Sequence, residues 1–308
     1  MNKNSHTGHL LVVGSMNMDL SVQVHEIPKP GETILGSRVQ QLAGGKGSNQ
    51  ATAAAKLGAH VSLIAMVGDD PFGTELINIA GESGVETKYI QIQSRERTGT
   101  ALITVSDKGE NAIVVAPGAN SELTPELVEA SILNIGDFDI MSSCLEIPLE
   151  SIATAFAIAR NQRAKTLLNA SPFNKKCLSL IPLTDYLIVN EHELREMCGT
   201  DVDEIEKLRV QLAGLGASKV VVTLGEDGAL YLDTSNSGLT ELRLPAPKIR
   251  AVDTTGCGDA FAGALAAEIA NGSEIQDALE LAIKAGSFAA TKFGAQPSYG
   301  TRAEVLAL

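Results

Sequence analysis

A short segment near the end of the chain could stabilise negative charge. Residues 253–259 read DTTGCGD and run directly into a helix of small apolar residues. Gly256 and Gly258 let the backbone turn its N–H groups toward one point, and the start of the helix adds a positive dipole there. Such a site suits phosphoryl transfer, with Asp259 placed to accept a hydroxyl proton. A glycine turn that only begins a helix, with Asp259 as a first-turn acid, explains the segment about as well.

A second glycine-rich segment, at residues 44–50, could approach a polyol. It reads GGKGSNQ and leads into an alanine-rich helix. A Walker A loop has the pattern GxxxxGK followed by Ser or Thr. If Gly45 and Lys46 were its GK pair, position 40 would be glycine and position 47 Ser or Thr, but the chain has Gln40 and Gly47 there. The glycines would instead allow a polyol close to the backbone, with Asn49 binding its hydroxyls. The P-loop class is therefore disfavoured.

Polar residues also follow two of the expected strands. Asn17 and Asp19 stand two residues apart after the first strand. In extended backbone both side chains face the same way and could bind adjacent hydroxyls. Glu146 follows a strand at 140–141 and precedes Pro148, so it could bind ligand hydroxyls in a similar way. Turn formation at a strand end explains each of these residues about as well.

Two further segments could serve a nucleotide and its cation. Asn190 and Glu193 open a helix after a strand at 186–189, and an amide and an acid at this spacing could order water around a cation. An ordinary helix cap explains the same pair. Residues 223–228 form a strand-to-turn segment whose backbone could line a nucleotide, although this signal is weak by itself.

The hydrophobic pattern indicates an α/β fold that would position these groups. Short β-branched runs alternate with helical stretches that carry charges on one side; the runs lie at 11–13, 61–65, 166–168, 186–189 and 220–223. This alternation predicts a central, mostly parallel sheet flanked by helices. A chain of 308 residues could form one large domain or two small ones.

Two regions, about 18–43 and 98–116, break this alternation. Each shows polar-apolar alternation typical of a hairpin, with expected strands at 20–24, 33–42, 100–105 and 112–115. We expect these strands to form a small separate sheet that acts as a lid. A lid that excludes water would matter for phosphoryl transfer, because water competes with the acceptor. A hairpin without function, or an oligomer contact, is the alternative.

Composition limits the partners. The net charge of −13 argues against nucleic acid and anionic membrane surfaces, which demand clustered Lys and Arg. The four cysteines show no CxxC spacing, which favours a reduced compartment. The apolar run at 10–13 is too short for a signal peptide or a membrane span, so we expect a cytoplasmic protein. The glycine pair near 256 lacks the third glycine of a dinucleotide site, since Phe261 stands there.

Taken together and in order, the segments resemble the ribokinase-like carbohydrate kinase family. The two signature regions are GGKGSNQA and DTTGCGDAFAGAL, and the similarity runs from about Leu10 to Ser298. Intermediate landmarks also match, at 68–73, 117–120, 190–193, 223–225 and 294–298. The resemblance implies a ribokinase-like fold, with a single domain spanning residues 1–308, and ATP-dependent phosphorylation of the primary hydroxyl of D-ribose.

The resemblance also implies roles for individual residues. Asp259 would be the base, and the anion hole would be formed by the backbone N–H groups of Gly256, Cys257 and Gly258. The sugar would be held by Asn17, Asp19, Gly45, Lys46, Asn49, Glu146 and Asp259. The nucleotide would lie along Asn190, Thr223, Gly225 and Gly228, with Glu193 ordering the water shell of Mg²⁺. An activating K⁺ would be held, mostly through carbonyl oxygens, by Asp253, Thr255, Ala289, Lys292, Gly294 and Ser298. The lid would also form the contact of a homodimer.

Other acceptors remain open at this stage. A kinase of the same family could act on 2-deoxyribose, on another sugar or on a nucleoside. A nucleoside would call for aromatic or apolar walls, whereas aromatic residues make up 4% of the chain and Trp is absent. A non-catalytic sugar-binding protein is a further alternative, because a fold does not determine function. The presence of Asp259 beside an intact glycine turn argues against it.

Overall fold

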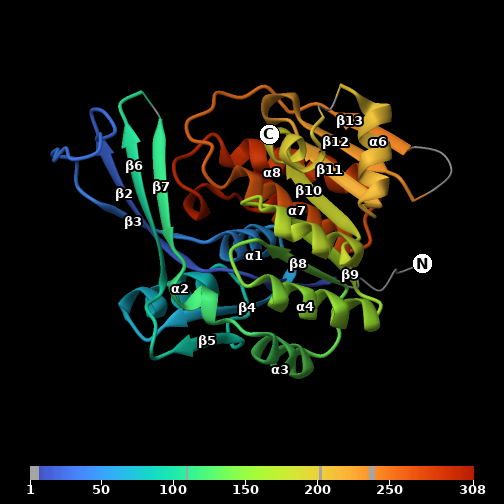
Figure 1. The fold of residues 1–308 in the computed structure, drawn as a ribbon, viewed down its shortest axis with the longest axis horizontal. Helices are drawn as coiled ribbons and strands as arrows, with labels where there is room; N and C mark the ends of the chain where they lie inside the picture. Colours follow the sequence, from blue (N-terminus) through green and yellow to red (C-terminus); the bar gives the residue numbers. More distant parts are fainter. Residues whose placement is uncertain (1–6, 109, 201–202, 236–239) are drawn as a thin grey trace.

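The protein is built around one large sheet flanked by helices (Figure 1). The computed structural model describes residues 7–308 except 109, 201–202 and 236–239. The sheet has nine strands in the order β13-β12-β11-β10-β9-β8-β1-β4-β5, and only β12 and β13 run antiparallel to their neighbours. Its strands are β1 (His9–Val13), β4 (His60–Gly68), β5 (Ile90–Gln93), β8 (Ile140–Cys144), β9 (Lys165–Asn169), β10 (Tyr186–Asn190), β11 (Lys219–Thr223), β12 (Ala229–Asp233) and β13 (Thr240–Leu244). The predicted mostly parallel α/β sheet is confirmed.

Helices cover both faces of this sheet, which explains its continuous hydrophobic strands. Along β1, Leu10 and Val12 join the core beneath α1 (Lys46–Lys56), α7 (Cys257–Ala270) and α8 (Ile275–Ala289). Leu11 and Val13 point the other way, into the core beneath α3 (Pro125–Ile135) and α4 (Leu149–Asn161). The remaining helices are α2 (Pro71–Glu82), α5 (Glu191–Cys198), α6 (Ile205–Gly214) and α9 (Arg302–Leu306). No helix in the described ranges has the length and apolar character needed to cross a bilayer.

Helices α1 and α7 lie in close contact, and this contact joins the two glycine-rich segments. Residues 259–270 of α7 are all buried. A Cβ atom on Gly263 would lie 2.3 Å from the carbonyl oxygen of Gln50 in α1, so only glycine allows the two helices to approach here. The approach brings the start of α7 next to the first turns of α1.

A second sheet of four strands stands beside the main sheet, at the left of Figure 1. Its order is β3-β2-β6-β7, formed by β2 (Asn17–Val24), β3 (Gln40–Gly44), β6 (Gly99–Ser106) and β7 (Asn111–Ala116). The predicted small sheet is therefore confirmed, as are its antiparallel hairpins β2–β3 and β6–β7, which are joined by parallel pairing of β2 with β6. The strand expected at 33–42 is wrong: only Gln40–Gly44 pairs with β2, and residues 33–39 form an exposed loop.

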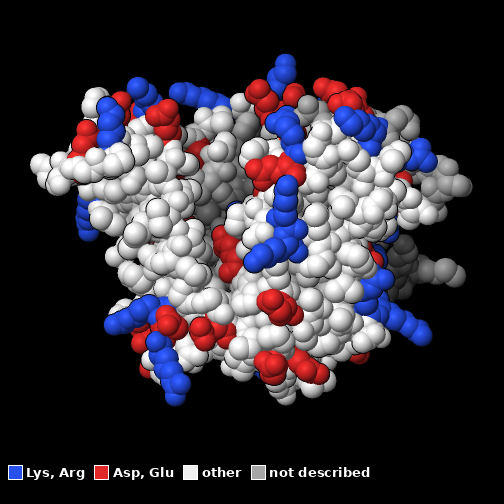
Figure 2. Space-filling view, in the orientation of Figure 1, with Lys and Arg blue, Asp and Glu red and all other residues white. Residues whose placement is uncertain are grey.

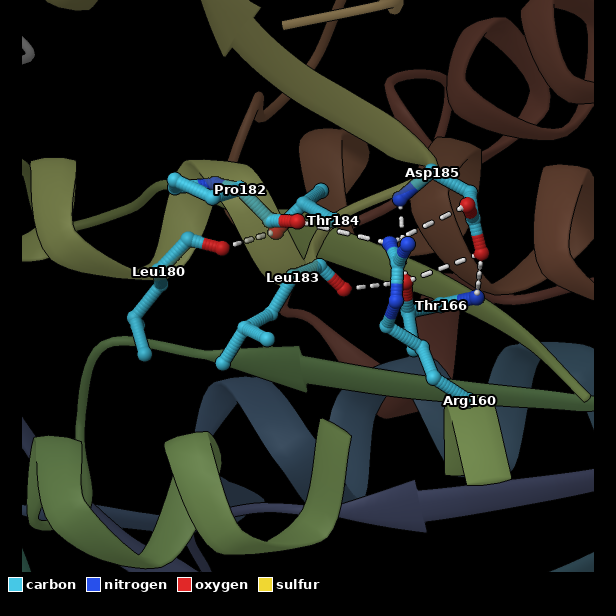
Figure 3. Close-up of polar contacts among 7 residues, drawn as sticks. All are labelled: Arg160, Thr166, Leu180, Pro182, Leu183, Thr184 and Asp185. Carbon is cyan, nitrogen blue, oxygen red and sulfur yellow. Dashed lines mark hydrogen bonds and ion pairs between the residues drawn. The ribbon is translucent and has the colours of Figure 1, made fainter. Parts of the chain in front are cut away.

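The amino-terminal ends of the parallel strands are fastened by a polar network (Figure 3). The backbone N–H of Thr166 in β9 donates to Asp185 Oδ2 at 2.9 Å, and the Asp185 N–H donates to Thr166 Oγ1 at 2.9 Å. Arg160 at the end of α4 donates to the Pro182 carbonyl at 3.4 Å and lies 3.6 Å from Asp185 Oδ1. These contacts lie at the ends of β9 and β10 opposite to Asn190, which follows the carboxyl end of β10.

Candidate active site

A cavity of about 220 Å³ lies at the carboxyl ends of the parallel strands. Its lining consists of Lys46, Asn169, Ser171, Ile188, Val189, Asn190, Glu193, Thr223, Thr254, Gly256, Gly258 and Asp259. Figure 2 shows this side of the molecule hollowed between the four-stranded sheet and the main body, with acidic side chains in the hollow. Parallel sheets bind ligands at this edge, and the strand-end residues of the lining come from β9, β10 and β11.

The glycine turn before α7 forms one wall of the cavity. Gly256 has φ +75° and caps the helix, in a conformation that favours glycine. Its carbonyl accepts a hydrogen bond from Tyr299 Oη at 3.1 Å. The Cys257 N–H donates to the Thr254 carbonyl at 3.2 Å, whereas the Gly256 and Gly258 N–H groups have no partner among the described residues. The structure therefore leaves two of the three expected anion-hole amides free and uses the third within the turn.

Asp259 lies in the first turn of α7 and is 5% exposed. Its carboxylate accepts hydrogen bonds from Asn49 Nδ2 at 2.9 Å and from Gln50 Nε2 at 3.2 Å, both on α1. Burial raises the pKa of Asp259, although the Lys46 ammonium and the two amides oppose this shift. The carboxylate in turn raises the pKa of Lys46, so the lysine stays charged. A buried carboxylate with a raised pKa is a stronger base than one in water, which suits proton removal from a hydroxyl.

Asn17 and Glu146 are held in fixed orientations. Asn17 Oδ1 accepts a hydrogen bond from Asn120 Nδ2 at 2.8 Å, so the Asn17 amide is turned with its own donors away from Asn120. Glu146 Oε2 accepts from the Lys46 backbone N–H at 3.1 Å and from Ser15 Oγ at 2.5 Å. Fixed polar groups of this kind select a ligand by the pattern of its hydroxyls.

Asp19 lies against the backbone of the second glycine segment. A Cβ atom on Gly44 would lie 2.2 Å from Asp19 Oδ2, so glycine makes room for this carboxylate. Gly45, with φ +86°, allows a similar approach, because a Cβ there would lie 2.6 Å from the Asn17 backbone nitrogen. The pKa of Asp19 is raised to about 7, first by burial and then by the carboxylates of Glu146 and Asp259.

The raised pKa makes Asp19 a source of instability in the ligand-free protein at alkaline pH. The folded state keeps a proton that the unfolded chain, with its ordinary pKa of 3.8, has released; stability therefore falls as the pH rises from about 4 to 7. We expect Asp19→Asn to raise the free energy of unfolding by roughly 1–3 kcal/mol at pH 8 and by much less at pH 4.5. Urea unfolding at both values measures this difference. An equal change at the two pH values would contradict the assignment.

Asn190 and Glu193 form a reciprocal helix cap at the start of α5. Asn190 Oδ1 accepts from the Glu193 N–H, and Glu193 Oε2 accepts from the Asn190 N–H, both at 2.8 Å. The structural interpretation of this pair is thus correct, and the pair also lines the cavity together with Thr223. A buried acid fixed at the cavity wall fits the role of ordering water around a divalent cation.

Gly225 and Gly228 are not part of the cavity lining. A Cβ on Gly228 would lie 2.0 Å from the Leu244 carbonyl oxygen, so this glycine serves the turn between β11 and β12. Asn169, Ser171 and Thr254 do line the cavity and were missed from the sequence. Asn169 could have been found, because it ends a buried strand in the same way as Asn190.

The two segments expected to hold K⁺ lie side by side. Asp253 Oδ2 accepts from the Gly294 N–H at 2.9 Å, and Asp253 Oδ1 accepts from the Thr255 N–H at 2.9 Å. The Ser298 N–H and hydroxyl both donate to the Ala295 carbonyl. Carbonyl, hydroxyl and carboxylate oxygens of this set match the oxygen ligands that hard cations take, so the residues present fit the ion.

The chain matches proteins of one family over nearly its whole length. The pattern of the pfkB family carbohydrate kinases matches residues 7–302. The ribokinase of Bacillus subtilis (strain 168) is 36% identical over 298 residues, which cover 96% of this chain and 98% of that protein. The deoxyribokinase of Salmonella typhi is 32% identical over 294 residues, which cover 94% of this chain and 95% of that protein.

A solved structure agrees with the sequence match. The Arabidopsis thaliana ribokinase complexed with ribose and ATP has a TM-score of 0.87 and 29% identity to this protein, and the match covers 98% of both chains. These matches confirm the resemblance drawn from the two glycine-rich segments. The chain belongs to the pfkB family of carbohydrate kinases.

Proposed function

We propose that this kinase transfers the terminal phosphoryl group of ATP to the 5-hydroxyl of D-ribose, giving ribose 5-phosphate and ADP. The observation that carries the proposal is Asp259, a buried carboxylate held by two amides beside the glycine turn of α7. The ribokinases among its relatives, one of them complexed with ribose and ATP, support ribose as the acceptor.

In the proposed reaction, Asp259 removes the proton of the primary hydroxyl while the hydroxyl oxygen attacks the terminal phosphorus in line with the leaving ADP. The free amides of Gly256 and Gly258, together with the start of α7, stabilise the charge on the transferring group. Lys46 adds a positive charge on the same side of the cavity. Mg²⁺, ordered through water by Glu193, would neutralise phosphate charge. K⁺, held by the loops around Asp253 and Gly294, would support the shape of the glycine turn.

We assign the sugar hydroxyls to Asn17, Asp19 and Glu146, with Asn49 and the backbone at Gly45 completing the set. The nucleotide would lie along Asn190 and Thr223. Four apolar side chains of β6 and β7 are exposed and support the use of the lid as a homodimer contact; they are Leu102, Ile113, Val114 and Val115. A monomeric mass in sedimentation equilibrium would contradict the dimer. Cysteines without disulfide partners support a cytoplasmic location.

The second candidate is a 2-deoxyribose kinase, because a deoxyribokinase is among the relatives. The polar pair Asn17 and Asp19 favours ribose, since a deoxy sugar would leave one of these buried groups without a partner. An unpaired group costs roughly 1–3 kcal/mol, so we expect kcat/KM for ribose to exceed that for 2-deoxyribose by roughly 5–150-fold.

The test is a coupled ADP-release assay with ribose, 2-deoxyribose, fructose and several nucleosides. Asn17→Ala should narrow the ratio between ribose and 2-deoxyribose, because it removes one of the groups that reads the hydroxyls. A preference for 2-deoxyribose in the wild-type protein would replace the proposed acceptor. No turnover with any acceptor would favour a sugar-binding protein instead.

A further inference from the structure

Gln296 connects the carboxy-terminal segment of the chain to the side chain of Asp259. It lies in a short helix, η4 (Gln296–Ser298), and is 4% exposed. Its Nε2 donates to Asn49 Oδ1 at 3.1 Å and to Ser48 Oγ at 3.0 Å. Asn49 then donates through Nδ2 to Asp259 Oδ2 at 2.9 Å. Two side-chain amides in series therefore lead from Gln296 to the carboxylate.

The direction of this series is determined by chemistry. An ionised carboxylate only accepts hydrogen bonds, so Asn49 must present Nδ2 to Asp259. Its Oδ1 then points to the other side and requires a donor, which Gln296 Nε2 supplies. If the Asn49 amide rotated by half a turn, Oδ1 would face the carboxylate, and two acceptors would repel each other in a buried place.

We propose that Gln296 is a positioning residue for phosphoryl transfer: it fixes the Asn49 amide with Nδ2 toward Asp259 and so holds the carboxylate in its working orientation. The inference rests on the proposed role of Asp259 as the base. Gln296 acts through Asn49 and has no direct contact with Asp259 in the described hydrogen bonds.

Anchoring of the chain end does not account for this side chain. The segment is already fastened by Lys56 Nζ, which donates to the Gln296 and Tyr299 carbonyls at 3.0 Å each, and by the Tyr299 hydroxyl on Gly256. The Gln296 Oε1 atom is buried without a partner among the described residues. The donors of this amide are directed at Ser48 and Asn49 in the first turn of α1 and not at the chain end. The side chain therefore supports the amide series in addition to any contribution to packing.

The titratable groups facing Asp259 stay unchanged in Gln296→Met, whereas Gln296→Glu adds a carboxylate to them. They are Lys46, Glu146, Asp19, Cys144, Cys257 and Tyr299. The hydrogen bond from Asn49 lowers the pKa of Asp259 because it stabilises the charged form. A change in the acid limb of the pH profile in Gln296→Met thus reports on the amide series.

The test compares Gln296→Met, which removes the donor at similar volume, with Gln296→Glu, which places an acceptor opposite Asn49 Oδ1. We expect Gln296→Met to lower kcat by roughly 5–30-fold at unchanged KM for ATP, and to move the acid limb of kcat/KM for the sugar upward by about half to one pH unit. Gln296→Glu should show the larger loss, because its carboxylate attracts Asn49 Nδ2 away from Asp259.

The matched control is Lys56→Met, which removes the anchor on the Gln296 and Tyr299 carbonyls but leaves every side chain of the amide series in place. It should lower the melting temperature and leave the pH profile in place. Wild-type kcat and pH profile in both Gln296 variants would overturn the inference, and so would the same pH shift in Lys56→Met. If Gln296→Met does not fold, kcat and the pH profile of the isosteric Gln296→Glu variant test the inference. Full turnover in Asp259→Asn would instead overturn the proposed base, whatever Gln296 does.

Discussion

Asp259→Asn is expected to lower kcat by roughly 10²–10⁴-fold, the usual contribution of a positioned general base. Affinity for sugar and ATP should stay near that of the wild type, because asparagine keeps the size of the side chain and one oxygen for the amides of Asn49 and Gln50. The variant removes only the ability to take the hydroxyl proton as the phosphoryl group moves. Steady-state kinetics together with calorimetric binding of ribose and a non-hydrolysable ATP analogue measure the two effects separately.

Glu268→Gln is a suitable control for this experiment. Glu268 is also a buried carboxylate on α7, at 5% exposure, but it accepts hydrogen bonds from Arg302 and Ser273 and does not line the cavity. The same change of acid to amide should lower stability there and leave kcat within about twofold, because no catalytic group is altered. Near-normal kcat in Asp259→Asn would mean that another residue is the base.

Much of the site could be predicted because its residues stand at strand ends and helix starts. Asn190 and Thr223 end neighbouring parallel strands whose carboxyl ends meet at one edge, and the start of α7 places Asp259 in the same cavity. The positions where the backbone requires glycine could also be predicted from the sequence. Gly45 and Gly256 have positive φ, which a sequence can signal by the residue type alone.

The supporting amides could not be predicted from the sequence. Asn120, Gln50 and Gln296 lie within segments that carry the family resemblance, but the sequence does not show which groups they support, because those contacts span 103 to 247 residues of chain. The joining of the two predicted hairpins through parallel β2 and β6 was missed for a similar reason. It is a long-range contact, whereas the polar-apolar alternation of each strand indicates only the local hairpins, which the structure has.

Gly256→Ala should reduce turnover by roughly 10²–10³-fold, because it disturbs the amides that stabilise the moving charge. The backbone there has φ +75°, and the new Cβ would lie 2.6 Å from both the Ala295 Cβ and the Tyr299 hydroxyl oxygen. Either the turn or the segment around Tyr299 must shift, so the free energy of unfolding should also fall by about 1–3 kcal/mol.

Gly258→Ala distinguishes an effect on the conformation of the turn from an effect on the free volume of the cavity beside it. Gly258 lies in the first turn of α7 with no atom within 4 Å of its Cβ position and without a positive φ, so alanine should leave stability unchanged or raise it by about 0.4–1 kcal/mol. Any loss of turnover in Gly258→Ala then reflects the added methyl group at the cavity wall. If Gly256→Ala kept wild-type kcat while losing stability, the glycine turn would be a structural helix start, and the charge on the phosphoryl group would have to be stabilised by Lys46 and Mg²⁺ instead.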